Sequence, residues 1–284
     1  MLITIIGHSG FIGKSLADFL TNKGHSVIKF NRTDFFSDSN NFKIYNSDVI
    51  INLAGKPIIG KWTSKYKKEI YDSRINTTKR IVDIISKSVQ KPKLLINASA
   101  IGIYSNDGIL NEYSNNFSKN FISKLVLDWE NEAKKAEQSG VRTIITRFGI
   151  VLGKNGGAFP KMIKPFKYYL GGNIGTGNQN FSFIHIKDLL NAFEFLINNP
   201  DAKGIYNIVS PNPIKNKDFT KSLSKKLHKP AFFNVPKWIL KLIYGEGASV
   251  LTEGQSVIPK RLIDDNFKFK YPDIETALNE LLEN

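Results

Sequence analysis

Three glycines near the start of the chain, Gly7, Gly10 and Gly13, are spaced as a phosphate-binding turn would require. The apolar run from Leu2 to Ile6 precedes them and predicts one strand buried on both faces. From Phe11 onward the apolar spacing is helical. A strand, a glycine turn and a helix place a dinucleotide pyrophosphate at a helix N-terminus, where free N–H groups and the helix dipole favour anionic oxygens. We therefore expect a nucleotide site rather than a simple tight turn, with contacts from Gly7, Ser9, Gly10, Phe11, Ile12 and Gly13.

A second strand, predicted at Ser26 to Phe30 and expected to be buried, would end near the adenosine ribose of such a nucleotide. An acidic residue there would bind both ribose hydroxyls and select NAD. Here Asn31 and Arg32 follow the strand instead, and the first carboxylate is Asp34. Because an Arg can form a charge-assisted pair with a 2′-phosphate, Arg32 favours NADP, the alternative being an ordinary surface Arg.

The remaining pattern predicts an α/β fold with a Rossmann-type, doubly wound parallel sheet. Strands are expected at Asp48 to Leu53, Lys93 to Ala98 and Arg142 to Thr146, with helices at Ser64 to Ser88 and from Phe121 to Gly140. Strands that alternate with helices imply parallel pairing, since each parallel return needs a crossover helix. Leu53, Ala54 and Gly55, at the end of one strand, would form the floor of the nucleotide site.

We expect two structural units. Residues 1–152 form the NADP-binding Rossmann domain, and 182–198 return to it. Residues 153–284 form a smaller, mixed α/β lobe, in which glycines and prolines break the pattern into short elements. A small-molecule substrate would then bind in the cleft between the lobes.

Composition narrows the function further. The chain of 284 residues has no cysteine and four histidines, none paired at ligand spacing, so we expect no metal. Its net charge is +15, but the basic residues are dispersed, which favours a solvated surface over specific nucleic-acid binding. The apolar runs are too short to span a bilayer, and the first strand has no basic region before it as a signal peptide would. We expect a cytoplasmic protein with no membrane partner.

The motifs together resemble a known family. The turn GHSGFIG, NLAG after one strand, NASAIGIY after another and FIHIKDL later are similar to the extended short-chain dehydrogenase/reductases. NLAGKPI, YDSRINTTK, DWENEAKKAE and TRFGIVLGKNGGAFPKM resemble an atypical, epimerase-like branch of that family. Residues 244–284 resemble its small C-terminal domain of unknown function. His8 and Ser9 depart from the Gly-Thr that is usual in relatives.

The resemblance implies a Tyr and, four residues later, a Lys on one helix as the usual proton-transfer pair. None of the ten tyrosines has a Lys at that spacing. Aligning Glu130 with the usual glutamate of that helix puts Ile122 at the Tyr position and Val126 at the Lys position. Lys124 would point away around the helix and is a poor replacement.

Other site residues are retained. The resemblance implies that Ser99 is the catalytic Ser, although a strand-end hydroxyl that caps backbone groups is an alternative. Tyr104 is close enough in sequence to serve as a substitute acid. Arg74 replaces a structural Asn, and would reach the nicotinamide half or an anionic substrate, or form a surface ion pair. Asp188 is expected to cap a helix N-terminus.

Two functions follow from these residues. The first is an NADP-dependent oxidoreductase or nucleotide-sugar-epimerase-like enzyme that lacks the usual Tyr and Lys. The alternative is a non-catalytic NADP(H)-binding redox sensor or regulatory protein. A nucleic-acid-binding module is the weakest hypothesis because no basic-aromatic surface motif is present.

Overall fold

A six-stranded parallel sheet forms the centre of the computed structural model, which describes residues 1–37 and 46–283. The strand order is β11-β6-β4-β3-β1-β2, and every neighbouring pair is parallel. The strands are β1 (Leu2–Ile6), β2 (Ser26–Phe30), β3 (Val49–Asn52), β4 (Leu94–Ala100), β6 (Arg142–Phe148) and β11 (Gly204–Ile208). The predicted fold class, a doubly wound α/β sheet, is confirmed.

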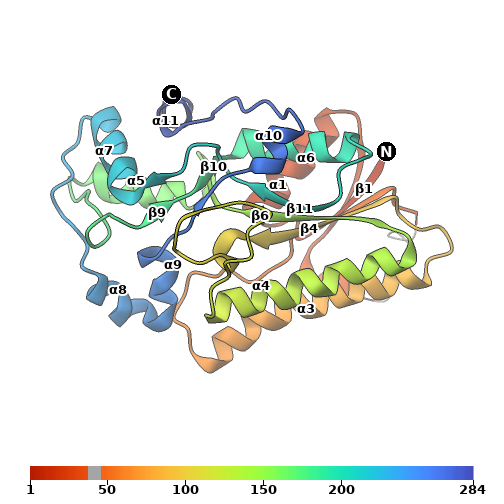
Figure 1. The fold of residues 1–284 in the computed structure, drawn as a ribbon. Coiled ribbons are helices and arrows are strands. Elements are labelled where there is room, and N and C mark those ends of the chain that lie inside the picture. The colour runs from red at the N-terminus through yellow and green to blue at the C-terminus, as the bar shows by residue number, and fades with distance from the viewer. Residues whose placement is uncertain (38–45, 284) are drawn as a thin grey trace.

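Helices cover both faces of this sheet (Figure 1). On one face lie α1 (Phe11–Asn22) and α6 (Ile186–Asn198), which contact each other. On the other lie the paired helices α3 (Ser64–Lys87) and α4 (Phe121–Lys134), followed by the 3-10 helix η3 (Lys135–Ser139). The short α2 (Arg32–Phe36) follows β2. The side chains of Thr63 and Asn120 accept hydrogen bonds from backbone N–H groups and so cap the N-termini of α3 and α4. A polar residue in the sequence therefore determines where each of these helices begins.

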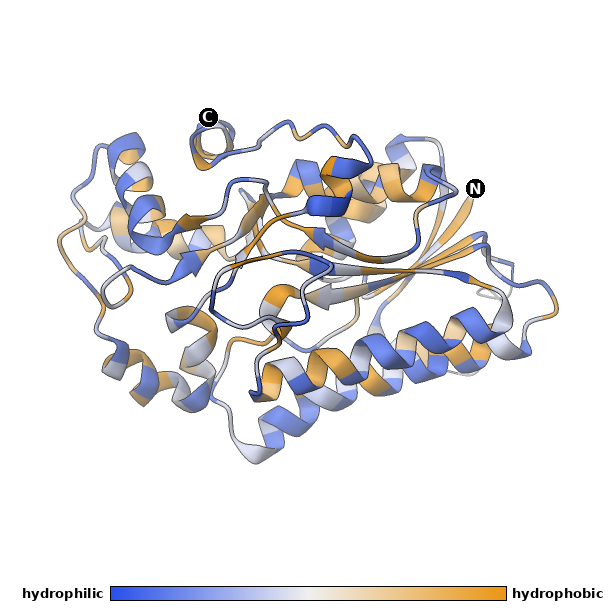
Figure 2. Ribbon diagram, in the orientation of Figure 1, coloured by the Kyte–Doolittle hydropathy of each residue, from blue (hydrophilic) through white to orange (hydrophobic). Residues whose placement is uncertain are grey.

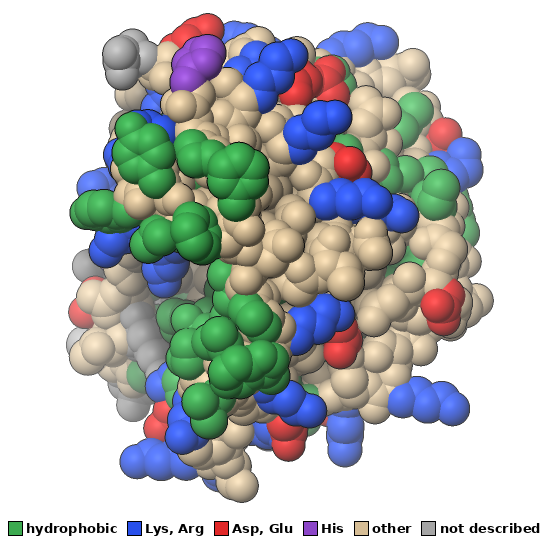
Figure 3. Space-filling view, turned by 90° about the vertical axis from the view of Figure 1, so that its left-hand side faces the viewer, with side chains coloured by type: hydrophobic (Ala, Val, Ile, Leu, Met, Phe, Trp, Pro, Cys, Tyr) green, Lys and Arg blue, Asp and Glu red, His purple; other side chains and the backbone are tan. Residues whose placement is uncertain are grey.

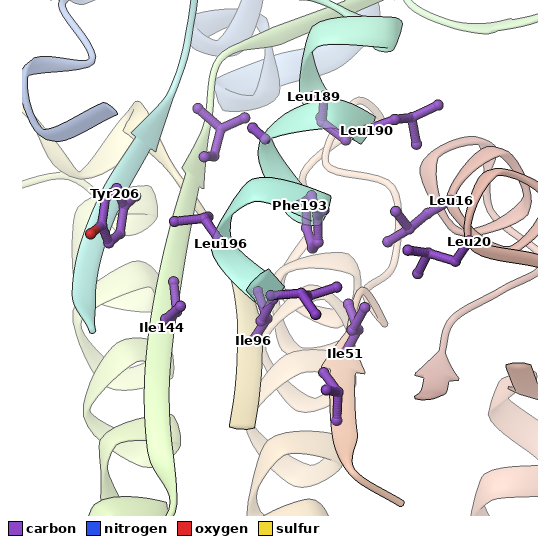
Figure 4. Close-up of a cluster of buried hydrophobic side chains, with 14 of the residues drawn as sticks. Leu16, Leu20, Ile51, Ile96, Ile144, Leu189, Leu190, Phe193, Leu196 and Tyr206 are labelled. Atoms are coloured by element: carbon purple, nitrogen blue, oxygen red, sulfur yellow. The ribbon is translucent and has the colours of Figure 1, made fainter. Parts of the chain in front are cut away.

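The main hydrophobic core lies between the sheet and the pair α1 and α6. Figure 2 shows apolar strands at the centre, between helices whose outer faces are hydrophilic. Figure 4 shows side chains of the two helices meeting those of the strands, among them Leu16, Leu20, Leu189, Phe193, Leu196, Ile51, Ile96 and Ile144. Burying such side chains is worth about 1.5–3 kcal/mol each, which fixes the sheet under the site.

A smaller lobe packs beside the carboxyl ends of the strands. Its small sheets are β7 (Ile150–Gly153), β8 (Gly156–Gly157) and β10 (Phe183–His185); β9 (Asn180–Phe181) with β12 (Ile214–Lys215); and β5 (Ile109–Leu110) with β13 (Ser256–Val257). Its helices are α5 (Phe159–Lys167), α7 (Asn216–Leu227), α8 (Lys237–Tyr244), α9 (Ser249–Thr252), α10 (Lys260–Asp264) and α11 (Ile274–Leu282). Short 3-10 helices are η2 (Ile101–Ile103) and η4 (Gly245–Ala248).

Three details differ from the expectations. β2 is an edge strand, so its burial is only partial rather than complete. β11 completes the main sheet, so the return of the chain to the first unit extends beyond residue 198. Asp188 does not cap α6, because His185 holds that position and accepts from the Lys187 N–H. The buried Asp188 carboxylate instead accepts from the backbone N–H groups of Lys270 and Tyr271 and anchors the C-terminal segment.

Within the part of the chain that the structure describes, no helix combines the length and apolar character needed to cross a bilayer. The same residues contain no group of three or more His, Asp or Glu side chains placed to hold a metal.

Candidate functional site

A cleft of about 580 Å³ opens at the carboxyl ends of β1, β3, β4 and β6. The strand ends and the glycine turn form its floor, and α4 forms one wall. The C-terminal lobe closes it from the other side through Ser249, Val250 and 253–255. Residues of the sheet edge, of α4 and of the C-terminal part of the chain therefore all line the cleft. Of the predicted site residues it is lined by Gly7, Gly10, Phe11, Ile12, Gly13, Leu53, Ala54, Gly55, Arg74 and Ser99.

The glycine turn admits no larger residue at Gly7 or at Gly13. Gly7 has a φ of +93°, and a Cβ there would lie 2.8 Å from the backbone of Leu53 and Ala54. A Cβ on Gly13 would lie 2.3 Å from the Gly7 carbonyl oxygen. Gly10 precedes α1 without any side-chain cap, which leaves the first-turn N–H groups open. This end of α1 can therefore receive an anionic group.

The second lobe packs directly on this turn through Phe11. A Cβ on Gly153 or Gly156 would approach the Phe11 ring to 2.4 or 2.3 Å, so both positions need glycine. Gly157 of the same hairpin lines the cleft. The sequence does not predict this contact, and the closely spaced glycines of the run GKNGG are the signal that could have indicated it.

Arg74 of α3 points its guanidinium toward the cleft. The group lies 5.2 Å from the centroid of the Trp129 ring, and a Cβ on Gly55 would meet it at 3.0 Å. Nη1 donates to the Ile70 carbonyl at 3.1 Å, and no carboxylate among the described residues pairs with it. Burial lowers the pKa of Arg74 to about 10. The surface ion pair considered above is absent from the described structure, and the remaining N–H donors are available to a ligand.

Hydrogen bonds among buried polar side chains, which we call the polar ladder, hold Trp129 in place. Its Nε1 donates to Thr78 Oγ1 at 2.9 Å, and Asn52 Nδ2 donates to the same oxygen. Asn52 Nδ2 also lies 2.7 Å from Asn97 Oδ1. The ladder joins β3, β4, α3 and α4, so the surface under Arg74 is rigidly positioned.

Ser99, at the end of β4, belongs to a buried polar network. Its Oγ donates to Glu130 Oε1 at 2.5 Å. Arg147 binds both oxygens of that carboxylate, each at 2.7 Å, and its Nη1 donates to the Tyr104 hydroxyl at 2.7 Å. Burial alone would lower the pKa of Arg147, but the bonds and the charge of Glu130 raise it on balance. Because an ionised carboxylate can only accept, Ser99 offers lone pairs rather than its proton to the cleft.

Tyr104 lies behind the cleft wall. Its side chain has no exposed surface, and its hydroxyl is engaged by Arg147 and by Asn207 at 3.1 Å. Burial raises the pKa of this phenol. Tyr104 does not line the cleft, so its hydroxyl is not placed to act as a substitute acid toward a ligand there.

The predicted Tyr and Lys positions are apolar parts of the cleft, since Ile122 and Val126 both line it. Lys124 is exposed and not part of the lining. Ser9 is exposed and lies outside the lining as well. The side chain of Arg32 is outside the described residues, and the structure gives only its place at the start of α2.

Together, a doubly wound parallel sheet, a glycine turn after its first strand and a cleft at the carboxyl ends define a Rossmann-type dinucleotide-binding protein. The model of the NAD dependent epimerase/dehydratase family matches residues 3–209, and the chain belongs to that family. A domain of unknown function, DUF1731, matches residues 235–281. Both matches confirm the resemblance drawn from the motifs.

Relatives cover the whole chain. The epimerase family protein YfhF of Bacillus subtilis (strain 168) is 37% identical over 99% of this chain and 98% of its own length. The Arabidopsis thaliana epimerase family protein SDR39U1 homolog, named as chloroplastic, is 35% identical over 100% of this chain and 87% of its own length. The crystal structure of human epimerase family protein SDR39U1 (isoform 2) with NADPH is similar with a TM-score of 0.91 at 30% identity, covering 100% of both chains.

Proposed function

We propose that this protein is an NADP(H)-dependent oxidoreductase of the epimerase-like class. It would transfer hydride between a nicotinamide and a small carbonyl or hydroxyl compound in the cleft. The observation that carries the proposal is that the glycine turn, Arg74 and Ser99 all line one cleft. Such a cleft holds both a phosphate-binding end and a polar group where chemistry is expected.

The residues fit a dinucleotide. The turn can form only with glycine at Gly7 and Gly13, and the uncapped start of α1 presents donors to a pyrophosphate. Leu53, Ala54 and Gly55 would form the floor under it. Arg32 would bind a 2′-phosphate and so select NADP over NAD. The NADPH in the human relative's structure supports this choice.

Arg74 would supply the cation that Val126 cannot. Typical members place that charge on α4, whereas here a guanidinium reaches the same cleft from α3. Its planar donors suit a ribose or an anionic group at the nicotinamide end. Bound nicotinamide would supply or accept the hydride.

Ser99 would hold the reacting oxygen of the substrate. Its proton is directed to Glu130, so it accepts a hydrogen bond from a substrate hydroxyl. Ile122 cannot transfer a proton and Tyr104 is enclosed, so we assign proton exchange to water that reaches the cleft, while Ser99 orients the reacting hydroxyl.

A second candidate is a non-catalytic NADP(H)-binding sensor or regulatory protein. The apolar side chains at both proton-transfer positions, Ile122 and Val126, favour it. In this case the cleft would bind the cofactor and the protein would respond to its redox state without turnover.

One experiment separates the two candidates. NADPH binding is measured by calorimetry, and the loss of NADPH absorbance is followed with a panel of quinones, ketones and sugar nucleotides. Binding with turnover of any member supports the oxidoreductase. Tight binding without turnover across the panel supports the sensor, and no NADPH binding contradicts both.

A further inference from the structure

A second surface, away from the floor of the cleft, exposes an unusual number of large apolar side chains. α8 buries none of its residues, and its Trp238 and Leu242 are 67% and 75% exposed. Beside it, Phe232 is 82% exposed and Tyr168 66%. Figure 3 shows hydrophobic side chains gathered on this face. We call the surface formed by residues 161–170, 229–233 and α8 the basic apolar face.

Its segments form one continuous surface. The Phe233 N–H donates to the Gly171 carbonyl at 3.0 Å, and the Val235 N–H to the Asn173 carbonyl at 2.8 Å. These bonds place residues 168–170 beside 232–233. The chain then enters α8 directly, and Lys237 packs on Gly175. A contiguous apolar patch of this kind marks an interaction site.

The charge of the face is entirely positive. No Asp or Glu occurs in residues 138–187 or in 219–245. Lysines on and around the apolar side chains are Lys161, Lys164, Lys167, Lys229, Lys237 and Lys241. None of the six forms an ion pair with a carboxylate in the described part of the chain. The face therefore combines exposed aromatic and aliphatic groups with unneutralised cations.

The partner must match both properties. A second copy of the chain would bring like-charged lysines together in a symmetric contact, where these segments offer no carboxylate. An anionic lipid surface instead receives the apolar side chains at its acyl boundary and the lysines at its phosphates. We propose that the basic apolar face docks this protein peripherally on an anionic membrane. This proposal revises the expectation of no membrane partner, because that expectation rests on the lack of an apolar run long enough to span a bilayer, and surface docking needs no such run.

Docking here would place the cleft close to the lipid. The Trp62 N–H donates to the carbonyl of Tyr244, the last residue of α8. η4 and α9 follow at once, and Ser249 and Val250 of α9 line the cleft. The proposal does not depend on hydride transfer, so it stands whichever function the cleft performs.

Vesicle sedimentation with the full chain tests the proposal. Vesicles of phosphatidylcholine alone are compared with vesicles that also contain phosphatidylglycerol, at low and at high salt. We expect binding to the anionic vesicles only, and weaker binding at high salt. The variant Lys237→Gln/Lys241→Gln should lose about fivefold in affinity for each lysine replaced. Trp238→Ser/Leu242→Ser should bind more weakly at both salt concentrations.

Matched controls are Val89→Ser and Lys91→Gln, which change exposed residues in the loop after α3. They should bind vesicles as the unmodified chain does, and all variants should keep their NADPH affinity. The proposal is overturned if the unmodified chain ignores anionic vesicles or if the face variants bind as well as the controls. A dimer in light scattering that Trp238→Ser/Leu242→Ser dissociates would also overturn it, because a second copy would then cover the face.

Discussion

Ser99 Oγ donates to Glu130 Oε1 over 2.5 Å, and this bond sets what the serine can do. Both groups are buried, and Glu130 is already bound on both oxygens by Arg147. The carboxylate accepts the hydrogen of the serine, so the O–H bond of Ser99 points toward Glu130 rather than into the cleft. Ser99 acts toward a ligand through its lone pairs.

Ser99→Ala should reduce turnover by about a hundredfold if the protein is an oxidoreductase, because the reacting oxygen loses its partner. NADPH affinity should change much less. Steady-state kinetics and calorimetry measure the two effects. Ser123→Ala is the matched control, since the hydroxyl of that buried serine of α4 donates to the Ile103 carbonyl. Equal kinetic losses in both variants would contradict a role for Ser99 in the reaction.

Glu130→Gln should destabilise the fold by about 3–5 kcal/mol, because it leaves the buried Arg147 without its counter-charge. The midpoint of urea unfolding measures this loss. The double variant Glu130→Gln/Arg147→Met also removes the buried guanidinium that Glu130→Gln leaves unpaired, so it should recover part of the lost free energy of unfolding. A double variant as unstable as the sum of the two single ones would show that the pair is not coupled.

Arg74→Met should weaken NADPH binding by about tenfold or more, since a charge-assisted bond is worth about 1.5–3 kcal/mol. Its thermal stability should be unchanged or higher, because burial lowers the pKa of Arg74 and the fold therefore disfavours the charge. Calorimetry and thermal melting measure the two. Arg142→Met is the control: Arg142 donates to the Leu196, Asn199 and Ala202 carbonyls, so its loss should lower stability and spare NADPH binding. A less stable Arg74→Met with normal NADPH affinity would make Arg74 structural.

Arg32→Asp should reduce the preference for NADPH over NADH by about tenfold or more, because the 2′-phosphate would lose its cation and face a carboxylate. Titration with both cofactors measures the ratio. Lys221→Asp makes the same charge change at an exposed position of α7 and should leave the ratio unaltered. If Arg32→Asp leaves the ratio of NADPH to NADH affinity unchanged, a group other than Arg32 binds the 2′-phosphate.

The free energy of unfolding should fall as the pH drops below about 6.5, in part through His185. Its Nδ1 accepts from the Lys187 N–H at 3.2 Å and its Nε2 lies 2.8 Å from Glu280 Oε2, which fits a neutral ring. Burial lowers the pKa of His185, so its contribution is complete above the unfolded value near 6.5 and is lost as the pH falls toward the folded value.

His185→Asn keeps a capping side chain without the titration and should flatten this part of the pH profile. Chemical denaturation at a series of pH values provides the measurement. His228→Asn is the control, because His228 is exposed at the end of α7 in a left-handed conformation that Asn tolerates. A profile unchanged by His185→Asn would place the pH dependence elsewhere.

The sequence alone determined the parts of this protein that depend on local spacing. The alternation of strands and helices gave the parallel sheet, because a parallel return needs a crossover. Gly7 and Gly13 predicted a turn that no other residue can form, and the structure shows backbone contacts that exclude a Cβ there. The sequence also shows that the usual Tyr and Lys pair is absent, since the two residues must be four positions apart to share one helix face.

Only the tertiary structure decided which side chains meet. Ser99 and Tyr104, Glu130, and Arg147 come from three separate stretches of the chain, and their pairing depends on strand order and helix placement. Tyr104 was therefore expected in the cleft and lies behind it. Three further features could not be predicted from the sequence. They are the edge position of β2, the capping role of His185 and the exposed face of α8. An apolar helical pattern predicts that a helix can bury one face, but the neighbours that cover that face or leave it open are set by the whole fold.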